Sequence, residues 1–191
     1  MRRSIFLSLL FAFIVPLASA QTSTWVPDKA HSEVGFSILH MSLSNVHGQF
    51  GNIGGTIQWD EADISKSVVN ITIDATSVDT GEGARDSALK SSGFFDTDKF
   101  PTVTFASTGV AKSAGGLTVN GNLTLHGVTK PVVLEVDGPN GPVPGTDHKP
   151  HVGFSATTTI DRTAFGIGSA YPAAIVGDEV KLTIDLEAVK Q

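Results

Sequence analysis

Residues 77–105, SVDTGEGARDSALKSSGFFDTDKFPTVTF, form the stretch that decides the fold of this chain. Segments on both sides of it alternate apolar and polar residues, whereas this stretch does not. Asp79 followed by Glu82 fits a capping pair that begins a helix, and residues 84–91 have a composition that tolerates helix. Gly93 ends that pattern. Because an excursion of about 25 residues between strands is long for a compact domain, we expect a short helical insertion with a function, such as a lid.

Apolar residues that recur at every second position dominate the rest of the chain, which is typical of half-buried strands. The longest run places Val180, Leu182, Ile184, Leu186 and Ala188 on one face. Turn signals rich in glycine separate the runs. The pattern predicts eight strands, near residues 32–40, 46–59, 67–76, 102–111, 116–126, 130–138, 151–161 and 179–189, with one loop from Pro139 to Pro150.

Short turns and the absence of a strand–helix–strand rhythm predict an all-β, antiparallel sheet. Eight such strands with no obvious device to protect their edges favour closure into a lipocalin-like barrel, because closure removes edges altogether. A two-sheet sandwich is the alternative fold. The sequence shows no internal repeat and no linker, so residues 21–191 are expected to form a single domain.

The first twenty residues have the composition of an export signal. Met1-Arg2-Arg3 is positively charged, residues 5–15 are apolar, and Ala18-Ser19-Ala20 fits a cleavage site. The apolar run is too short to span a bilayer, which needs about 20 residues. We therefore expect residues 1–20 to be a cleaved signal peptide and the protein to be periplasmic or secreted. No later apolar stretch is long enough for stable membrane insertion.

Charge and cysteine content exclude some partners and sources of stability. The formal net charge is −6, and two of the thirteen basic residues belong to the signal. A protein this acidic has no electrostatic reason to bind nucleic acid or an anionic membrane surface. It has no cysteine, so its stability must come from burial and strand pairing rather than from disulfides.

The ordered series of motifs resembles the YceI-like family of exported, lipocalin-like proteins. The motifs are Trp25, Asp28 and His31; Val34-Gly35-Phe36 and His40; Gly48-Gln49-Phe50; the stretch 77–105; residues 121–132; Gly153-Phe154-Ser155-Ala156; and Arg162 with Phe165-Gly166 and Asp178-Glu179-Val180. The resemblance implies an eight-stranded barrel with helical cover. It also implies that a polyisoprenoid, such as an isoprenoid quinone or prenyl lipid, or a similar long-chain amphiphile is bound in an apolar tunnel, without a reaction.

Apolar side chains on the expected walls and lid are the candidate lipid contacts. They are Phe36, Ile38, Phe50, Phe94, Phe105, Leu123, Leu125, Leu134, Phe154 and Phe165. Each of them alone fits an ordinary core, and only their joint placement favours a ligand. Arg162 and His40 are candidate headgroup contacts, since a guanidinium pairs with acidic groups. The alternative for Arg162 is a structural pair with Asp161 or another carboxylate.

No motif of an enzyme, cofactor site or metal site stands out. The sequence lacks a G-x-S-x-G elbow, a Walker loop and a G-x-G-x-x-G after a strand. His148 and His151 flank Pro150 in a loop, without a third ligand at suitable spacing. We therefore expect no cofactor and no metal. Two other hypotheses stay open: a structural or partner-binding barrel without ligand, and an enzyme that modifies such lipids. Apolar faces on the excursion fit either a lid or a homodimer contact.

Overall fold

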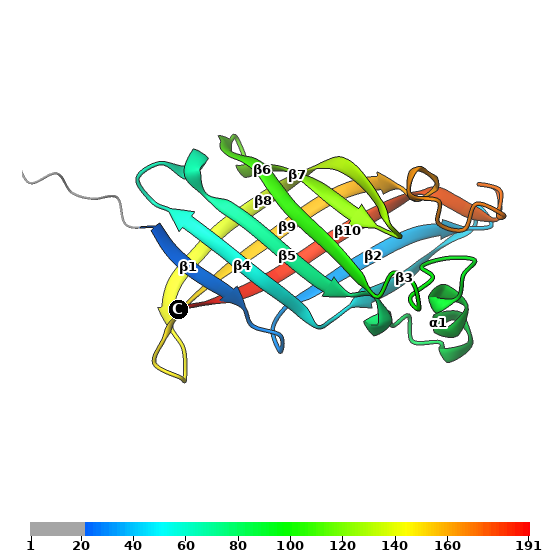
Figure 1. Ribbon diagram of the computed structural model, residues 1–191, viewed down its shortest axis with the longest axis horizontal. Coiled ribbons are helices and arrows are strands. Elements are labelled where there is room, and N and C mark those ends of the chain that lie inside the picture. The colour runs from blue at the N-terminus through cyan, green and yellow to red at the C-terminus, as the bar shows by residue number, and fades with distance from the viewer. Residues whose placement is uncertain (1–21) are drawn as a thin grey trace, which may run out of the picture.

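Ten antiparallel strands and one α-helix make up residues 22–191, the part of the chain that this computed structural model describes (Figure 1). The signal peptide expected at residues 1–20 lies outside the described residues. The strands are β1 (Thr22–Pro27), β2 (Glu33–His40), β3 (Ser44–Phe50), β4 (Ile53–Asp60), β5 (Val68–Asp74), β6 (Thr102–Ser113), β7 (Gly116–Leu125), β8 (Val128–Pro144), β9 (Pro150–Asp161) and β10 (Val176–Lys190); the helices are α1 (Gly83–Lys90) and the 3₁₀ turns η1 (Ile64–Lys66), η2 (Ala75–Ser77) and η3 (Thr163–Phe165). None of the described helices is long and apolar enough to cross a membrane.

Eight strand positions, which we call staves, close into a ring. This confirms the predicted eight-stranded antiparallel barrel and shows that the sandwich alternative is wrong. The order around the ring is β1–β4–β5–β6–β7–β8–β9–β10, and β1 pairs with β10 to close it. β10 is longer than β1: its last residues pair with β1, whereas Val176 to Asp185 pair with β2. The β2–β3 hairpin thus continues the β1 and β4 staves toward one end of the barrel.

The strands differ from the sequence-based expectation in three places. β1 was not expected. The run at 46–59 is two strands, because Asn52 adopts a positive φ of 51° and breaks the alternation there. The expected loop from Pro139 to Pro150 is mostly hairpin, because β8 extends to Pro144 and pairs with β9 through two register shifts. A proline lacks a ladder donor and is tolerated at such irregular positions.

The excursion between β5 and β6 carries α1, as expected, with a different cap. Glu82 is itself the N-cap and accepts a hydrogen bond from the Ala84 amide, whereas Asp79 accepts from the Gly81 amide before the helix begins. Figure 1 shows α1 at the end of the barrel where the β2–β3 turn and the connection from β9 to β10 also lie. We call this end the mouth.

The strand faces alternate along β10, yet the inward face is not tightly packed. On β10 the outward side chains of Lys181, Thr183 and Asp185 are exposed, whereas Leu182 and Ile184 between them are only half-buried. A side chain that points into a packed core would be buried more completely. The half-buried inward residues therefore face a hollow.

Candidate functional site

The hollow is an elongated cavity of about 470 Å³ inside the barrel. Every described strand except β1 contributes inward side chains to its wall, and α1 contributes Arg85, Ala88 and Leu89. Lining residues on β10 run from Val176 to Leu186. Ten residues of strand extend about 33 Å, or about 25 Å along the axis of a barrel with a usual tilt near 40°. The cavity is thus long and narrow rather than round.

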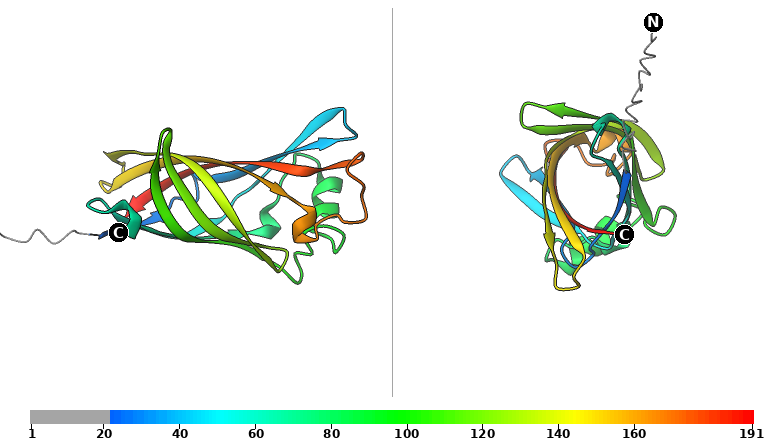
Figure 2. Two further views of the ribbon diagram at one scale, coloured as in Figure 1. Left: turned by 90° about the horizontal axis from the view of Figure 1, so that it is seen from above. Right: turned by 90° about the vertical axis from the view of Figure 1, so that its left-hand side faces the viewer.

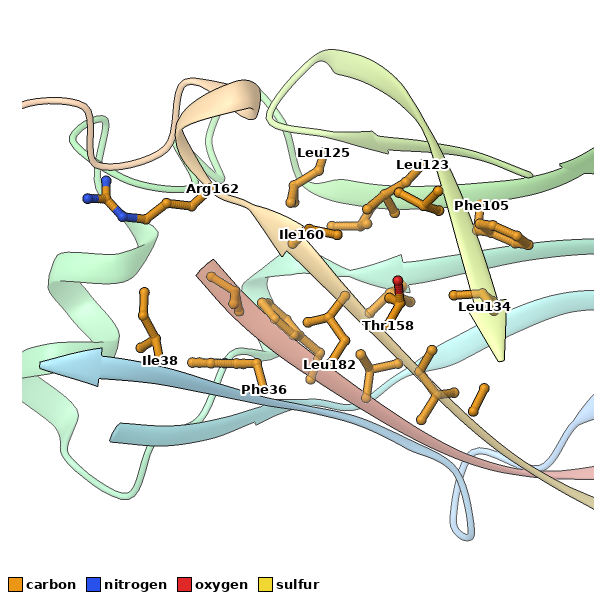
Figure 3. Close-up of a pocket in the computed structure, with 18 of the residues that line it drawn as sticks. Phe36, Ile38, Phe105, Leu123, Leu125, Leu134, Thr158, Ile160, Arg162 and Leu182 are labelled. Carbon is orange, nitrogen blue, oxygen red and sulfur yellow. The ribbon is translucent and has the colours of Figure 1, made fainter. Parts of the chain in front are cut away.

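The lining is almost entirely aliphatic and aromatic. Figure 3 shows Thr158 as the polar side chain in its middle, next to Leu182 and Ile160, with Arg162 at the mouth. A charged group placed in this interior would lose hydration without gaining a partner. By contrast, burial is worth about 0.8 kcal/mol per CH₂ group, or up to about 4 kcal/mol for a five-carbon isoprene unit. The chemistry of the wall therefore suits a long hydrocarbon chain.

The structure brings most of the predicted lipid contacts together in one wall. The nine that line the cavity are Phe36, Ile38, Phe50, Phe94, Phe105, Leu123, Leu125, Leu134 and Phe154. Their contact with a ligand stays a prediction. The tenth, Phe165, does not line the cavity: it lies in η3, beyond the end of β9, where it is 2% exposed and packs in the apolar core. Phe165 thus lies apart from the wall that the other nine form.

Several lining residues were missed by the sequence analysis. Ile160 and Leu182 share the inward parity of their strands, so the alternation itself was the available signal. Leu89 and Arg85 on α1 gave no such signal, because a short helix can dock on either end of a barrel. Phe95 follows α1 and packs edge-on against Phe50, with ring centroids 5.3 Å apart. That contact ties the helical segment, which we call the lid after its expected role, to the wall.

Arg162 is buried at the mouth and hydrogen-bonds the backbone there, so its predicted role as a headgroup contact needs correction. The residue is 2% exposed, and all three guanidinium nitrogens donate hydrogen bonds to protein oxygens. The acceptors, at 2.6 to 2.9 Å, are the carbonyls of Ile167, Gly168, Tyr171, Val176 and Gly177 and the Asp178 carboxylate. The structural carboxylate partner is thus Asp178, since Asp161 accepts from Thr163 instead. No donor is left over for a headgroup.

His40 and Arg85 line the cavity near its mouth with nitrogen-bearing side chains that are also exposed. Arg85 also holds the lid in place: its Nε donates to Thr80 Oγ1 at 2.8 Å and its Nη2 to the Thr80 carbonyl at 2.9 Å. Asp86 accepts from both the amide and the hydroxyl of Thr80. The Nη1 of Arg85 has no acceptor among the described residues, which leaves it available at the mouth.

A cluster of histidines and carboxylates lies at the opposite end of the barrel. One ligand atom from each of Asp28, His31 and Glu187 lies within 4.8 Å of the others, close enough to share a metal ion. Both carboxylates already have histidine partners, however: His31 lies 3.0 Å from Asp28, and His151 lies 2.6 Å from Glu187 and 3.0 Å from Asp147. We assign the cluster to ion pairs that join the β1–β2 connection, the β8–β9 hairpin and β10.

These ion pairs are expected to make the stability of that end dependent on pH. The hydrogen bonds of His151 to Asp147 and Glu187 raise its pKa, and the hydrogen bond to Asp28 raises the pKa of His31. An unfolded histidine titrates near about 6.5. The stabilisation is therefore fully present below that pH and is lost as the pH rises through the raised pKa values. The pKa values of Asp28 and Asp147 are lowered, mainly by His31 and by the Lys149 amide, so their contribution is lost only in acid.

We expect the unfolding midpoint in urea to fall between about pH 6 and 9 in the wild type and to change less in His151→Gln. His31→Gln is the matched comparison, with a smaller effect, since the His31 side chain is 64% exposed and exposed pairs contribute little. Parallel pH curves for the wild type and His151→Gln would contradict this assignment.

Comparison with known proteins identifies the family that this chain resembles. The family model described as the YceI-like domain matches residues 25–188. A UPF0312 protein of Vibrio parahaemolyticus is 35% identical over 198 residues, and the protein YceI of Salmonella newport is 36% identical over 197 residues. Both alignments cover 100% of each chain.

Solved structures share the barrel. Burkholderia cenocepacia BcnA superposes with a TM-score of 0.71 at 27% identity, covering 84% of this chain and 98% of that one. A YceI protein of Campylobacter jejuni also gives 0.71, at 30% identity, covering 80% and 90%. A polyisoprenoid-binding domain from Saccharophagus degradans gives 0.63 at 14% identity, covering 90% and 100%, and at that identity it shows the fold alone.

Proposed function

Because this chain belongs to the YceI-like domain family, we propose that it is an exported binding protein whose barrel holds a polyisoprenoid or a similar long-chain amphiphile. The observation that carries the proposal is the long apolar cavity, in which nearly every wall residue is aliphatic or aromatic. The Saccharophagus degradans neighbour, which shares the fold, is described as polyisoprenoid-binding. The signal-like sequence at residues 1–20 supports export to the periplasm or the exterior.

In the proposed complex the hydrocarbon chain lies along the barrel and its polar end stays at the mouth. In this arrangement His40 and the Nη1 of Arg85 would contact that polar end. Deeper polar contacts are few, with Thr158 as the main one. Binding would keep the chain away from water during transport, storage or sequestration.

Chain length should therefore govern affinity more strongly than the headgroup does. For a series of prenyl alcohols, we expect each added isoprene unit to tighten binding by about tenfold or more until the cavity is full, because burial outweighs the cost of ordering the chain. Exchanging the alcohol for a phosphate or quinone head should change affinity by about tenfold, no more than one isoprene unit does, since one charge-assisted hydrogen bond contributes about 1.5 kcal/mol. Native mass spectrometry of the mature protein measures both series.

The same experiment separates this proposal from its rivals. A protein that purifies empty and binds no member of the series would favour a structural or partner-binding barrel. Ligand that is recovered with a changed mass, in a manner lost on replacing His31, His40 or Arg162, would favour an enzyme. Affinity that is flat with chain length would contradict burial of the chain.

A further inference from the structure

Exposed apolar side chains gather around the mouth. Seven large hydrophobic residues are exposed in the described chain, and five of them belong to two segments at this end. We call these five the mouth rim: Leu39 (41% exposed), Met41 (50%) and Leu43 (81%) in the β2–β3 hairpin, and Tyr171 (44%) and Ile175 (40%) before β10. Scattered exposed apolar residues need no explanation, but a gathered set marks an interaction site.

Backbone contacts hold the two segments of the rim side by side. The Met41 amide donates to the Ile175 carbonyl at 2.8 Å, and His40 pairs with Val176 at the end of the β2–β10 ladder. The Tyr171 ring stacks on Phe94 of the lid, with centroids 5.2 Å apart. Arg162 fixes the second segment from inside through its bonds to the Tyr171 and Val176 carbonyls. The rim is thus built into the fold.

The rim is continuous with the cavity. Leu39, Tyr171 and Ile175 line the cavity as well as facing solvent, whereas Met41 and Leu43 lie only on the outside. An apolar surface therefore leads from the interior, over the edge of the mouth, to the tip of the hairpin. Figure 2 shows that hairpin tip reaching to the far end of the barrel, together with the connection before β10.

Charge is absent from both segments. Residues 34–59 and 163–177 contain no Asp, Glu, Lys or Arg, although 17% of the whole chain is charged. A surface that meets another protein is commonly edged with charged side chains, whereas charge is costly on a segment that reaches the acyl chains of a bilayer. Tyrosine and leucine are also the residue types that anchor proteins at the membrane interface.

We propose that the mouth rim docks into the headgroup region of a lipid bilayer, so that a lipid passes between membrane and cavity without crossing water. This rests on the proposed function, because only a cavity that takes a membrane lipid needs such a dock. A second copy of the chain is the competing occupant. A projecting hairpin tip suits insertion among lipids better than the broad self-complementary patch of a two-fold dimer.

The test compares two rim residues that do not line the cavity with a matched residue elsewhere. The test variant is Met41→Asp with Leu43→Asp, at a hairpin turn where Asp tolerates the positive φ of residue 41. The control is Val143→Asp, which is 59% exposed on the β8–β9 hairpin at the opposite end. Flotation with phosphatidylethanolamine–phosphatidylcholine vesicles, which carry no net charge, measures docking, and uptake of a fluorescent prenyl alcohol from those vesicles measures transfer.

We expect the double variant to lose flotation and to take up the probe about tenfold more slowly or worse, because each Asp replaces an apolar side chain that would be buried among lipids. Val143→Asp should match the wild type in both assays. The same prenyl alcohol delivered from detergent should bind both variants within about twofold of the wild type. The detergent experiment separates the two proposals. If the wild type itself did not bind the alcohol from detergent, the proposed function would be contradicted, whereas membrane docking is tested separately by flotation.

Two results would contradict the proposal that the mouth rim docks on a membrane. One is unchanged flotation and uptake in the double variant. The other is a wild-type dimer that the double variant converts to monomer while uptake stays the same, which would assign the rim to a second copy of the chain.

Discussion

Replacing Arg162 with Ala is expected to lower the free energy of unfolding by about 3–5 kcal/mol, because a buried side chain and its whole set of hydrogen bonds are lost. The substitution removes a donor from each of five backbone carbonyls, of which that of Gly168 still accepts from the Tyr171 amide, and leaves a buried space among them. A buried carbonyl without a donor costs about 1–3 kcal/mol. Water entering the space should recover part of that cost, so the sum of five such losses is not reached. Urea unfolding followed by circular dichroism measures the change.

Two variants distinguish the guanidinium fork from simple charge. Arg162→Lys keeps the charge but carries three donors on a single nitrogen, so it should recover less than half of the loss. Asp178→Asn removes the charge of a 43% exposed partner and should cost less than about 1 kcal/mol. Full recovery by lysine would mean that charge, and not the set of hydrogen bonds, is what the site needs.

A further measurement locates the damage. Hydrogen exchange in Arg162→Ala should accelerate at residues 163–177 far more than in β6 and β7, which Arg162 does not contact through hydrogen bonds. Because this segment carries Tyr171 and Ile175, the variant should also dock poorly on vesicles while its folded fraction still binds prenyl alcohol from detergent. Loss of ligand affinity with an intact fold would instead restore a headgroup role for Arg162.

The barrel could be predicted from the sequence because its periodicity is a local property. Alternation along β10, from Val180 to Ala188, specifies which face is inward without any knowledge of the partner strands. The breaks could not be predicted in the same way. The interruption between β3 and β4 depends on the backbone of Asn52, and the extension of β8 beyond Pro139 depends on register shifts that only the partner strand defines.

The hollow could not be predicted from periodicity, because a packed barrel and an empty one have the same inward pattern. Gly121, which interrupts the row of apolar side chains on the inward face of β7, is an example of a contact that the periodicity does not reveal. A Cβ atom at that position would collide with the ring of Phe105, so the glycine lets the ring lie flat against the wall. Gly48 does the same for Phe36. Aromatic rings that lie along the wall leave the centre open, and this requires contacts between strands that the sequence alone does not display.

The hydrogen-bond partners of Arg162 could not be predicted for a related reason. The sequence placed Asp161 beside it, but the acceptors are supplied by a segment that returns to β10 up to sixteen residues later. A buried arginine followed by an uncharged stretch rich in glycine was the available signal, since such a stretch offers many free carbonyls. Lid residues such as Leu89 gave no signal at all, because their position depends on how the excursion folds back over the mouth.

Blocking the cavity should have the largest effect on function. Thr158 lies in the middle of the cavity, faces Leu182 across the β9–β10 pair and is only half-buried because it borders the hollow (Figure 3). We expect Thr158→Trp to weaken binding of long prenyl alcohols by about a hundredfold or more, because the chain beyond that point loses at least one isoprene unit of burial. Short alcohols that end before residue 158 should bind nearly as in the wild type. Competition with a fluorescent prenyl probe measures both.

Thr157→Trp is the matched control, since it adds the same side chain one residue away, on the exposed outer face of the same strand. It should leave the affinity for every alcohol within about twofold of the wild type. Both variants should unfold cooperatively in urea, because the Trp at residue 158 enters open space rather than a filled core. If Thr158→Trp bound the longest alcohols as tightly as Thr157→Trp does, the ligand would have to lie elsewhere, and the apolar hollow would be a consequence of barrel size with no part in binding.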